Sequence, residues 1–367
     1  MTLIGTRPEA VKMAPVVRAV ERHVDMQSVL CVTGQHRQML DSVLRTFDLH
    51  PDVDLDVMQP NQQLAQTTAR ILTRVDEALA QHRPDWVIVQ GDTTTVMAAA
   101  LAAFYRGVRV AHVEAGLRTY DIRSPFPEEA NRRIADALAD LFLAPTNASR
   151  DNLLREGVRA DRIVVTGNTV VDALLMVRER VRGRSLESLT GPLGGRRLIL
   201  VTSHRRESFG EPFINTCRAL RHLAEMYRDE AHFVYPVHFN PNVQQPAHEM
   251  LAGLPNLTLT DPVDYETMVA LMDQSYLILT DSGGVQEEAP SLGKPVLVLR
   301  EKTERMEVVE RGAARLVGTD FDAIVRETSR LMSDAMAYRA MAEAGNPYGD
   351  GHAAERTVQA IAEFAAA

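Results

Sequence analysis

Cysteine and long apolar runs are scarce in this chain of 367 residues, and basic residues are fewer than acidic ones. The only cysteines, Cys31 and Cys217, lie far apart and form no CxxC pair, which excludes a disulfide framework and a readable zinc site. No apolar run approaches the length of a membrane span. The formal net charge of -9 gives no electrostatic basis for binding nucleic acid or an anionic membrane surface. We therefore expect neither partner, and an anionic ligand would need a local cluster of cations.

Other familiar signals are missing as well. No GxGxxG pattern follows the first predicted strand, so we expect no nicotinamide, and we expect no metal or other cofactor. The segment from Met1 to Arg7 is too short and too quickly charged for a secretory signal. We expect a cytoplasmic protein.

What is present indicates an α/β fold. The length favours two domains. Short apolar strands alternate with helical patterns in both halves, which predicts two Rossmann-like, doubly wound domains facing one another. We expect an N-terminal domain over 1–181, a linker rich in glycine, serine and arginine over 182–195, a second domain over 196–350, and a closing helix over 351–367.

The most informative stretch is 276–300, which predicts a strand, a tight turn, a short helix and a second strand. Ser282 suits the N-cap, and Gly283 and Gly284 leave the backbone N–H groups of the helix start open to a phosphate. A plain strand-to-helix turn is the alternative. Glu288, one turn later, either accepts hydrogen bonds from the hydroxyls of a ribose or only complements the helix dipole.

In the first half, charged residues follow three predicted strands. Arg7 and Lys12 lie in the turn and helix after the first strand, where open α/β sheets bind ligands, although a solvated helix start would also explain them. Asp92 follows the strand at 86–89, and capping of the next helix is an equal alternative. Glu114 follows the strand at 108–113, and an acid there indicates function. Glu128 opens a helix, where acids are common.

Six motifs together resemble one family. The chain closely resembles the non-hydrolysing bacterial UDP-N-acetylglucosamine 2-epimerases. The motifs that carry the resemblance occur in the family's order, at 5–15, 91–95, 112–119, 124–129, 204–207 and 280–290. The resemblance covers nearly the whole chain. It implies a GT-B architecture, with the active site in the cleft between two Rossmann-like domains and the last helix crossing back to the first domain, and it implies a homodimer.

The resemblance also implies an activity, the interconversion of UDP-GlcNAc and UDP-ManNAc. It assigns the catalytic carboxylates to Asp92, Glu114 and Glu128, and places His204 beside the diphosphate. The expected UDP contacts are Arg7, Lys12, Arg205, Ser282, Gly283, Gly284 and Glu288. In bacterial relatives a second UDP-GlcNAc often activates the enzyme, and the matching positions here are Gln35, His36, Gln38 and Gln62. Asn61 stands where some relatives have arginine, and Met306 where many have proline.

The chemistry requires these residue types. A proton on C2 of the sugar is acidic only if the bond between C1 and UDP breaks first or at the same time, which leads to 2-acetamidoglucal. Cations and amides are needed to hold the departing diphosphate. At least two acid/base groups are needed because the proton leaves one face of C2 and arrives at the other. Three carboxylates in one cleft repel one another, so one should have a raised pKa.

Other activities fit the same nucleotide-sugar site. They are epimerisation of a related UDP-diacetamido-uronate, a hydrolysing epimerase that releases free ManNAc, a GT-B glycosyltransferase, and a silent nucleotide-sugar sensor. The downstream use expected for an epimerase is surface polysaccharide synthesis.

Overall fold

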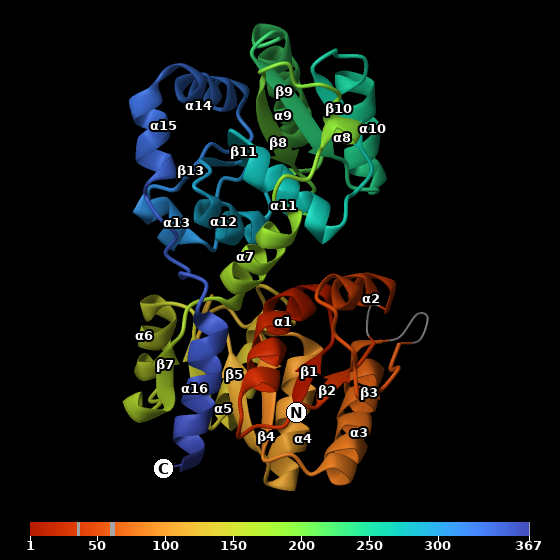
Figure 1. Ribbon diagram of the computed structural model, residues 1–367, viewed down its shortest axis with the longest axis vertical. Helices are drawn as coiled ribbons and strands as arrows, with labels where there is room; N and C mark the ends of the chain where they lie inside the picture. Colours follow the sequence, from red (N-terminus) through yellow and green to blue (C-terminus); the bar gives the residue numbers. More distant parts are fainter. Residues whose placement is uncertain (35–36, 59–62, 367) are drawn as a thin grey trace. The chain divides into compact units, whose positions relative to one another are not determined.

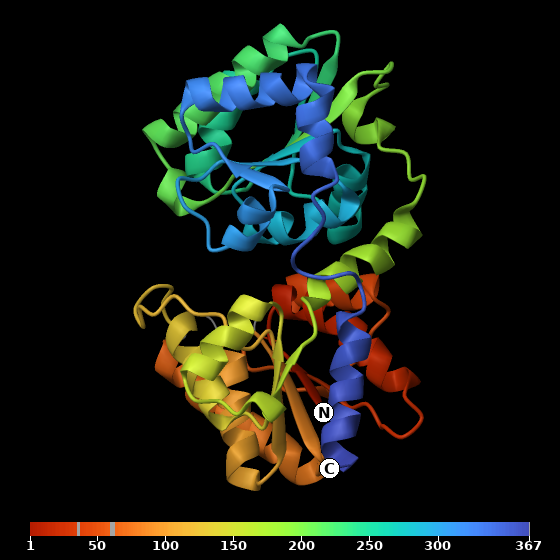
Figure 2. The same ribbon diagram turned by 90° about the vertical axis from the view of Figure 1, so that its left-hand side faces the viewer.

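The computed structural model describes residues 1–34, 37–58 and 63–366, which form two compact units. Unit 1 comprises Met1–Leu175 and Tyr348–Ala367, and unit 2 comprises Met176–Pro347. Both ends of the chain therefore belong to unit 1 (Figure 2). The division falls inside helix α7 (Thr169–Val181), so the stretch 182–195 lies within unit 2, where it contains the short helix α8 (Glu187–Thr190).

Unit 1 is built on a seven-stranded parallel sheet with the order β3-β2-β1-β4-β5-β6-β7. The strands are β1 (Thr2–Ile4), β2 (Leu30–Val32), β3 (Val53–Asp54), β4 (Trp86–Gln90), β5 (Arg109–Val113), β6 (Leu141–Ala144) and β7 (Ile163–Val165). The chain runs outward from β1 to β3 and then crosses over to β4. The strand order reverses between β1 and β4, and such a switch point is where open α/β sheets bind ligands.

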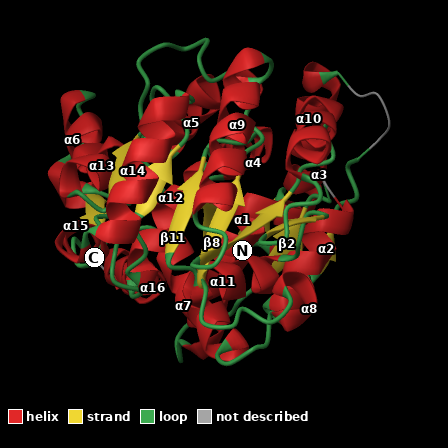
Figure 3. Cartoon of the chain, turned by 90° about the horizontal axis from the view of Figure 1, so that it is seen from above, coloured by secondary structure: helices red, strands yellow, loops and turns green. Residues whose placement is uncertain are grey.

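Helices cover both faces of this sheet (Figures 1 and 3). They are α1 (Arg7–Arg22), α2 (Arg37–Thr46), α3 (Leu64–His82), α4 (Thr94–Arg106), α5 (Glu128–Leu138), α6 (Asn147–Arg155) and α16 (Ala353–Ala366). A 3₁₀ turn, Ala160–Arg162, precedes β7. The apolar strands β1, β4 and β5 are buried between the helical layers, as parallel strands must be.

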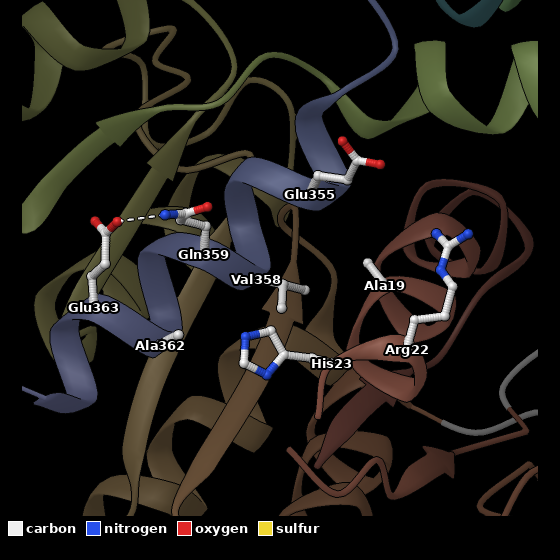
Figure 4. A pocket seen from close by; sticks show the side chains of 8 residues that line it. All are labelled: Ala19, Arg22, His23, Glu355, Val358, Gln359, Ala362 and Glu363. Atoms are coloured by element: carbon white, nitrogen blue, oxygen red, sulfur yellow. Dashed lines mark hydrogen bonds between the residues drawn. The ribbon is translucent and has the colours of Figure 1, made fainter. Parts of the chain in front are cut away.

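The last helix, α16, packs along α1 in unit 1 (Figure 1). The Asp172 carboxylate accepts hydrogen bonds from the N–H groups of Ala353 and Ala354 at 3.2 and 2.8 Å, which fixes the start of α16. A hollow of about 350 Å³ lies between the two helices (Figure 4). Its lining includes Arg22 and His23 at the C-terminal end of α1, at the opposite end of that helix from Arg7.

Unit 2 repeats the architecture with a six-stranded parallel sheet in the order β10-β9-β8-β11-β12-β13. Its strands are β8 (Arg197–Thr202), β9 (Ala231–Pro236), β10 (Leu257–Thr260), β11 (Leu277–Thr280), β12 (Val296–Val298) and β13 (Ala314–Leu316). The helices are α9 (Glu211–Met226), α10 (Pro241–Leu251), α11 (Tyr265–Gln274), α12 (Gly283–Glu288), α13 (Met306–Arg311), α14 (Phe321–Ser333) and α15 (Ala335–Ala342). The switch point here lies between β8 and β11.

The prediction of two Rossmann-like domains is confirmed by these sheets. The short strands β3 and β13 were not foreseen, because two or three residues are too few to show a period. No helix in the described part of the chain is both long and apolar enough to cross a membrane.

Candidate active site

In unit 1 the predicted site residues follow neighbouring strands at one edge of the sheet. Arg7 begins α1 after β1, Asp92 follows β4, and Glu114 follows β5. Because the strands are parallel and adjacent in the order β1-β4-β5, their carboxyl ends meet at the same edge. Glu128, the first residue of α5, is half-buried.

Glu114 is held in a buried ion pair. Lys12 Nζ donates to both of its carboxylate oxygens, at 2.9 and 2.8 Å, and the Gln90 amide donates to the same carboxylate. Only 12% of the Lys12 side chain and 8% of the Glu114 side chain are exposed, so the pair is shielded from water. Lys12, expected at a phosphate, is therefore the counter-ion of a predicted catalytic acid.

The backbone at Glu114 is in the left-handed region, with φ of +64°. This conformation costs a residue other than glycine roughly 1 kcal/mol or more and persists where the surrounding structure enforces it. Its N–H donates to the Leu143 carbonyl at 3.0 Å on β6, which holds the turn in place. Strained positions of this kind are concentrated at functional sites.

Asp92 does not cap the helix that follows it. The cap of α4 is Thr93, whose hydroxyl accepts from the Val96 N–H at 3.3 Å. The Asp92 carboxylate instead forms an ion pair with Arg132 on α5, and its carbonyl accepts from the Asn131 amide at 3.0 Å. The capping alternative is thus wrong, and the carboxylate, with 28% of its side chain exposed, faces a paired cation.

The two glutamates at the start of α5 differ in their surroundings. Glu129 is fully buried and accepts from the N–H groups of Thr119 and Tyr120, at 3.1 and 3.2 Å, and from Arg132 at 3.2 Å. Glu129 therefore anchors the loop before α5, a role that the sequence reading missed. Its spacing of three from Arg132 was the available signal.

Glu9 was also missed. Its buried carboxylate accepts from the N–H groups of Gly5 and Thr6 and, at 2.7 Å, from the Thr93 hydroxyl, so it joins the turn after β1 to the turn after β4. Burial raises the pKa of Glu9 to about 7, although these hydrogen bonds oppose the shift. The Thr6-x-x-Glu9 capping-box pattern could have revealed it.

In unit 2, Asp281 joins the ends of β8 and β11. One of its oxygens accepts from the Ser203 hydroxyl at 3.0 Å and from the N–H groups of His204 and Arg205 at 2.7 and 2.8 Å. Asp281 is completely buried. It fixes the turn that carries His204 and Arg205 at the switch point of this sheet.

The His204 ring is 39% exposed and stacks on His238, with 5.6 Å between ring centroids. Its Nδ1 lies 3.6 Å from the second oxygen of Asp281. Burial lowers the pKa of His204, although the Asp281 carboxylate acts in the opposite direction. Arg205 is half-buried, and its Nε makes no hydrogen bond within the described chain.

Arg305, which the sequence did not predict as part of the site, lies against the first residue of α12. A Cβ atom on Gly283 would come within 3.1 Å of Arg305 Cζ, whereas one on Gly284 would meet nothing nearer than 3.9 Å. Arg305 pairs with buried Glu287 at 2.8 Å, so its guanidinium lies against the turn. Ser282 is the N-cap residue, but its hydroxyl makes no capping bond.

Glu288, at the end of α12, is buried and accepts a hydrogen bond from the Tyr265 hydroxyl. The carboxylate therefore has a fixed orientation, as a group that recognises a ribose would need. The tyrosine could not be assigned to this role from the sequence, because it is distant along the chain.

Four expected residues cannot be placed. Gln35, His36 and Gln62 lie outside the described residues, as does the side chain of Gln38. Within residues 1–34, 37–58 and 63–366, no three His, Cys, Asp or Glu side chains gather in a way that could hold a metal ion.

Comparison with known proteins shows the family of this chain. The sequence model of the family described as UDP-N-acetylglucosamine 2-epimerase matches residues 18–362. The chain belongs to this family. It is 52% identical to UDP-N-acetylglucosamine 2-epimerase of Escherichia coli K12, covering 98% of this chain and 97% of that protein. It is 54% identical to a probable UDP-N-acetylglucosamine 2-epimerase of Ralstonia nicotianae, covering 99% and 98%.

Solved structures of the epimerase family share the fold. The UDP-GlcNAc 2-epimerase of Neisseria meningitidis bound to UDP-GlcNAc is 44% identical, with a TM-score of 0.89 and 99% of each chain covered. A glycosyltransferase from Streptomyces nogalater, at 16% identity and a TM-score of 0.58, shares the fold alone. The fold class is thus that of the GT-B proteins.

Proposed function

We propose that this member of the epimerase family interconverts UDP-GlcNAc and UDP-ManNAc by eliminating UDP to 2-acetamidoglucal and adding it back. Family membership over nearly the whole chain carries this proposal. Support from unit 1 comes from Asp92, Glu114 and Glu128, which are carried by adjacent elements at the switch-point edge.

These three carboxylates are proposed as the groups that act on the sugar. Cleavage of the bond between C1 and the diphosphate leaves positive charge at C1, which a carboxylate stabilises. Loss of the C2 proton to one group and its return from another on the opposite face then inverts C2. Asp92 and Glu114 each have a cation as partner, Arg132 and Lys12 respectively, and these ion pairs support fixed positions for both carboxylates.

Unit 2 is proposed to hold UDP. The turn at Ser282, Gly283 and Gly284 would receive the diphosphate on backbone N–H groups. Arg205 and His204 would add hydrogen-bond donors, and Glu288 would accept from the ribose hydroxyls. Arg7 of unit 1 is a further proposed UDP contact. Gln35, His36, Gln38 and Gln62 are proposed, on the resemblance alone, to bind an activating second UDP-GlcNAc.

The test is incubation of the purified protein with UDP-GlcNAc as the only substrate, followed by NMR. We expect a mixture of UDP-GlcNAc and UDP-ManNAc that is also reached from UDP-ManNAc. Free ManNAc with UDP would indicate a hydrolysing enzyme, and an unchanged substrate would indicate a transferase that lacks its acceptor or a binding protein. Conversion of a UDP-diacetamido-uronate in preference to UDP-GlcNAc would reassign the sugar.

We further propose a cytoplasmic homodimer that serves surface polysaccharide synthesis. Three large apolar side chains are exposed on the neighbouring helices α4 and α5, namely Phe104, Tyr105 and Ile134. Exposed apolar groups on adjacent helices favour contact with a second copy of the chain.

A further inference from the structure

A buried histidine that none of the proposed catalytic steps uses lies directly behind the Asp92 turn. His112, on β5, is completely buried. Its Nδ1 lies 2.6 Å from Asp136 Oδ1, and its Nε2 lies 2.7 Å from the carbonyl oxygen of Gly91. Burial acts to raise the pKa of Asp136, but His112 and Arg118 lower it overall, which favours the ionised carboxylate. Both ring nitrogens therefore face oxygen atoms that accept hydrogen bonds.

This geometry determines the protonation of the ring. A neutral imidazole has one N–H donor and one acceptor nitrogen, so one of the two contacts would set two acceptors against each other at a completely buried side chain. A doubly protonated ring satisfies both contacts. Asp136 also pairs with Arg118 at 2.7 Å, and Arg118 pairs in turn with Glu156. A protonated His112 and Arg118 therefore balance the charges of the two carboxylates.

The pKa of His112 agrees in direction. Burial acts to lower it, but the Asp136 carboxylate and the hydrogen bonds to Asp136 and Gly91 outweigh burial, and the pKa is raised above its ordinary value. The direction of this shift favours the charged ring that the two contacts require.

What the cation holds is the backbone before Asp92. Gly91, with φ of +80°, donates its N–H to the Val113 carbonyl at 3.0 Å, and its own carbonyl oxygen accepts from His112 Nε2. Both backbone polar groups of Gly91 are thus held by residues of β5. Asn131 and Arg132 then hold the carbonyl and the carboxylate of Asp92 itself.

We propose that His112, as a buried imidazolium, is a positioning residue for epimerisation that fixes the Gly91–Asp92 turn. The inference rests on the proposed role of Asp92. Asn131, Arg132 and Asp136 all lie on α5, so one helix and one histidine set the position of this carboxylate. An error of about 1 Å in such a group can lower the rate by about 100-fold.

Two substitutions separate positioning from simple packing. The amide nitrogen of His112→Gln can reach the position of Nε2 and donate to the Gly91 carbonyl, whereas the shorter amide of His112→Asn can replace only the contact of Nδ1 with Asp136. We expect His112→Asn to lower kcat by about 10- to 100-fold with KM for UDP-GlcNAc within about threefold of wild type. His112→Gln should recover most of kcat.

The protonation itself is measured on the wild-type protein by ¹⁵N NMR of the imidazole. Both nitrogens of His112 should be protonated at pH 7.5. A neutral ring there, or a folded His112→Asn protein with wild-type kcat, would overturn the inference. The NMR measurement uses only the wild-type protein, so it can overturn the inference even if a variant folds poorly. Failure of the proposed function would appear separately, as wild-type protein that makes no UDP-ManNAc.

Discussion

At the scale of single residues, carboxylates in this site owe their behaviour to their partners. Glu114 is paired with Lys12, Asp92 with Arg132, and Glu9 is buried against neutral donors. Burial raises the pKa of Glu9, although its hydrogen bonds oppose the shift. Residues of one type at one sheet edge therefore have different surroundings.

The first prediction concerns the three proposed catalytic groups. Asp92→Asn, Glu114→Gln and Glu128→Gln should each lower kcat by about 100-fold or more, because each removes a group that exchanges protons or stabilises charge. The affinity for UDP, measured by calorimetry, should change much less, since these residues act on the sugar. Near-normal kcat in all three variants would remove the assignment.

A second prediction concerns Glu9 and stability. The pKa of Glu9 is about 7 in the folded protein against 4.5 for an ordinary glutamate. Its stabilising contribution is complete below pH 4.5 and is lost as pH rises to about 7, because the unfolded chain ionises first. Over that range the wild type should lose up to about 3 kcal/mol of unfolding free energy relative to Glu9→Gln.

The measurement for Glu9 is urea denaturation of wild type and Glu9→Gln between pH 4.5 and pH 8. The difference between the two unfolding free energies should move in favour of the variant as pH rises. A difference that does not change with pH would show that the carboxyl is not protonated in the folded state.

At the scale of elements, two turns in unit 2 carry the residues proposed to bind UDP. Asp281 fixes the turn after β8, and Arg305 lies against the turn after β11. The two glycines of the second turn have different neighbours. A Cβ atom on Gly283 would lie 3.1 Å from Arg305 Cζ, so the guanidinium would have to shift slightly, whereas one on Gly284 would meet only ordinary contacts from the protein.

This difference gives the third prediction. Gly284→Ala should leave the melting temperature within about a degree or two of wild type and weaken UDP binding, because its methyl group would occupy space proposed for the diphosphate. Gly283→Ala is the matched control, in which weaker binding should accompany a shift of Arg305 and a lower melting temperature. Unchanged UDP affinity in Gly284→Ala would exclude the turn as a phosphate site.

The elements also show how far the sequence alone could lead. Strands and helices around the site were predictable, because β4, β5 and β11 are mainly apolar and are followed by charged or glycine-rich turns. The contacts were not. Neither the choice of Thr93 over Asp92 as a cap nor the approach of Arg305 to Gly283 follows from local spacing, because both depend on tertiary packing.

At the scale of the whole molecule, the chain contains two parallel α/β sheets of the same type, and different functional groups lie at their two switch points. The edge of unit 1 provides carboxylates, and the edge of unit 2 provides histidine, arginine and backbone amides. Elimination of a diphosphate from a sugar requires both sets.

The fourth prediction concerns assembly. Sedimentation should give twice the 40.7 kDa of one chain. Replacing the exposed Phe104 and Ile134 by glutamate should shift the protein toward the monomer, because charge would then be buried at the contact between copies. The control is substitution by glutamate of Met336, an apolar residue of unit 2 that is more exposed than either, and it should leave the mass unchanged. A wild-type monomer would contradict the proposal.

One measurement tests the proposed mechanism most directly: the reaction with UDP-GlcNAc in deuterated water, followed by NMR at C2 of the sugar. Removal and return of the C2 proton through carboxylates that exchange with solvent predicts deuterium at C2 in the UDP-ManNAc formed and, with time, in the remaining UDP-GlcNAc. UDP-ManNAc that keeps its original hydrogen at C2 would contradict it.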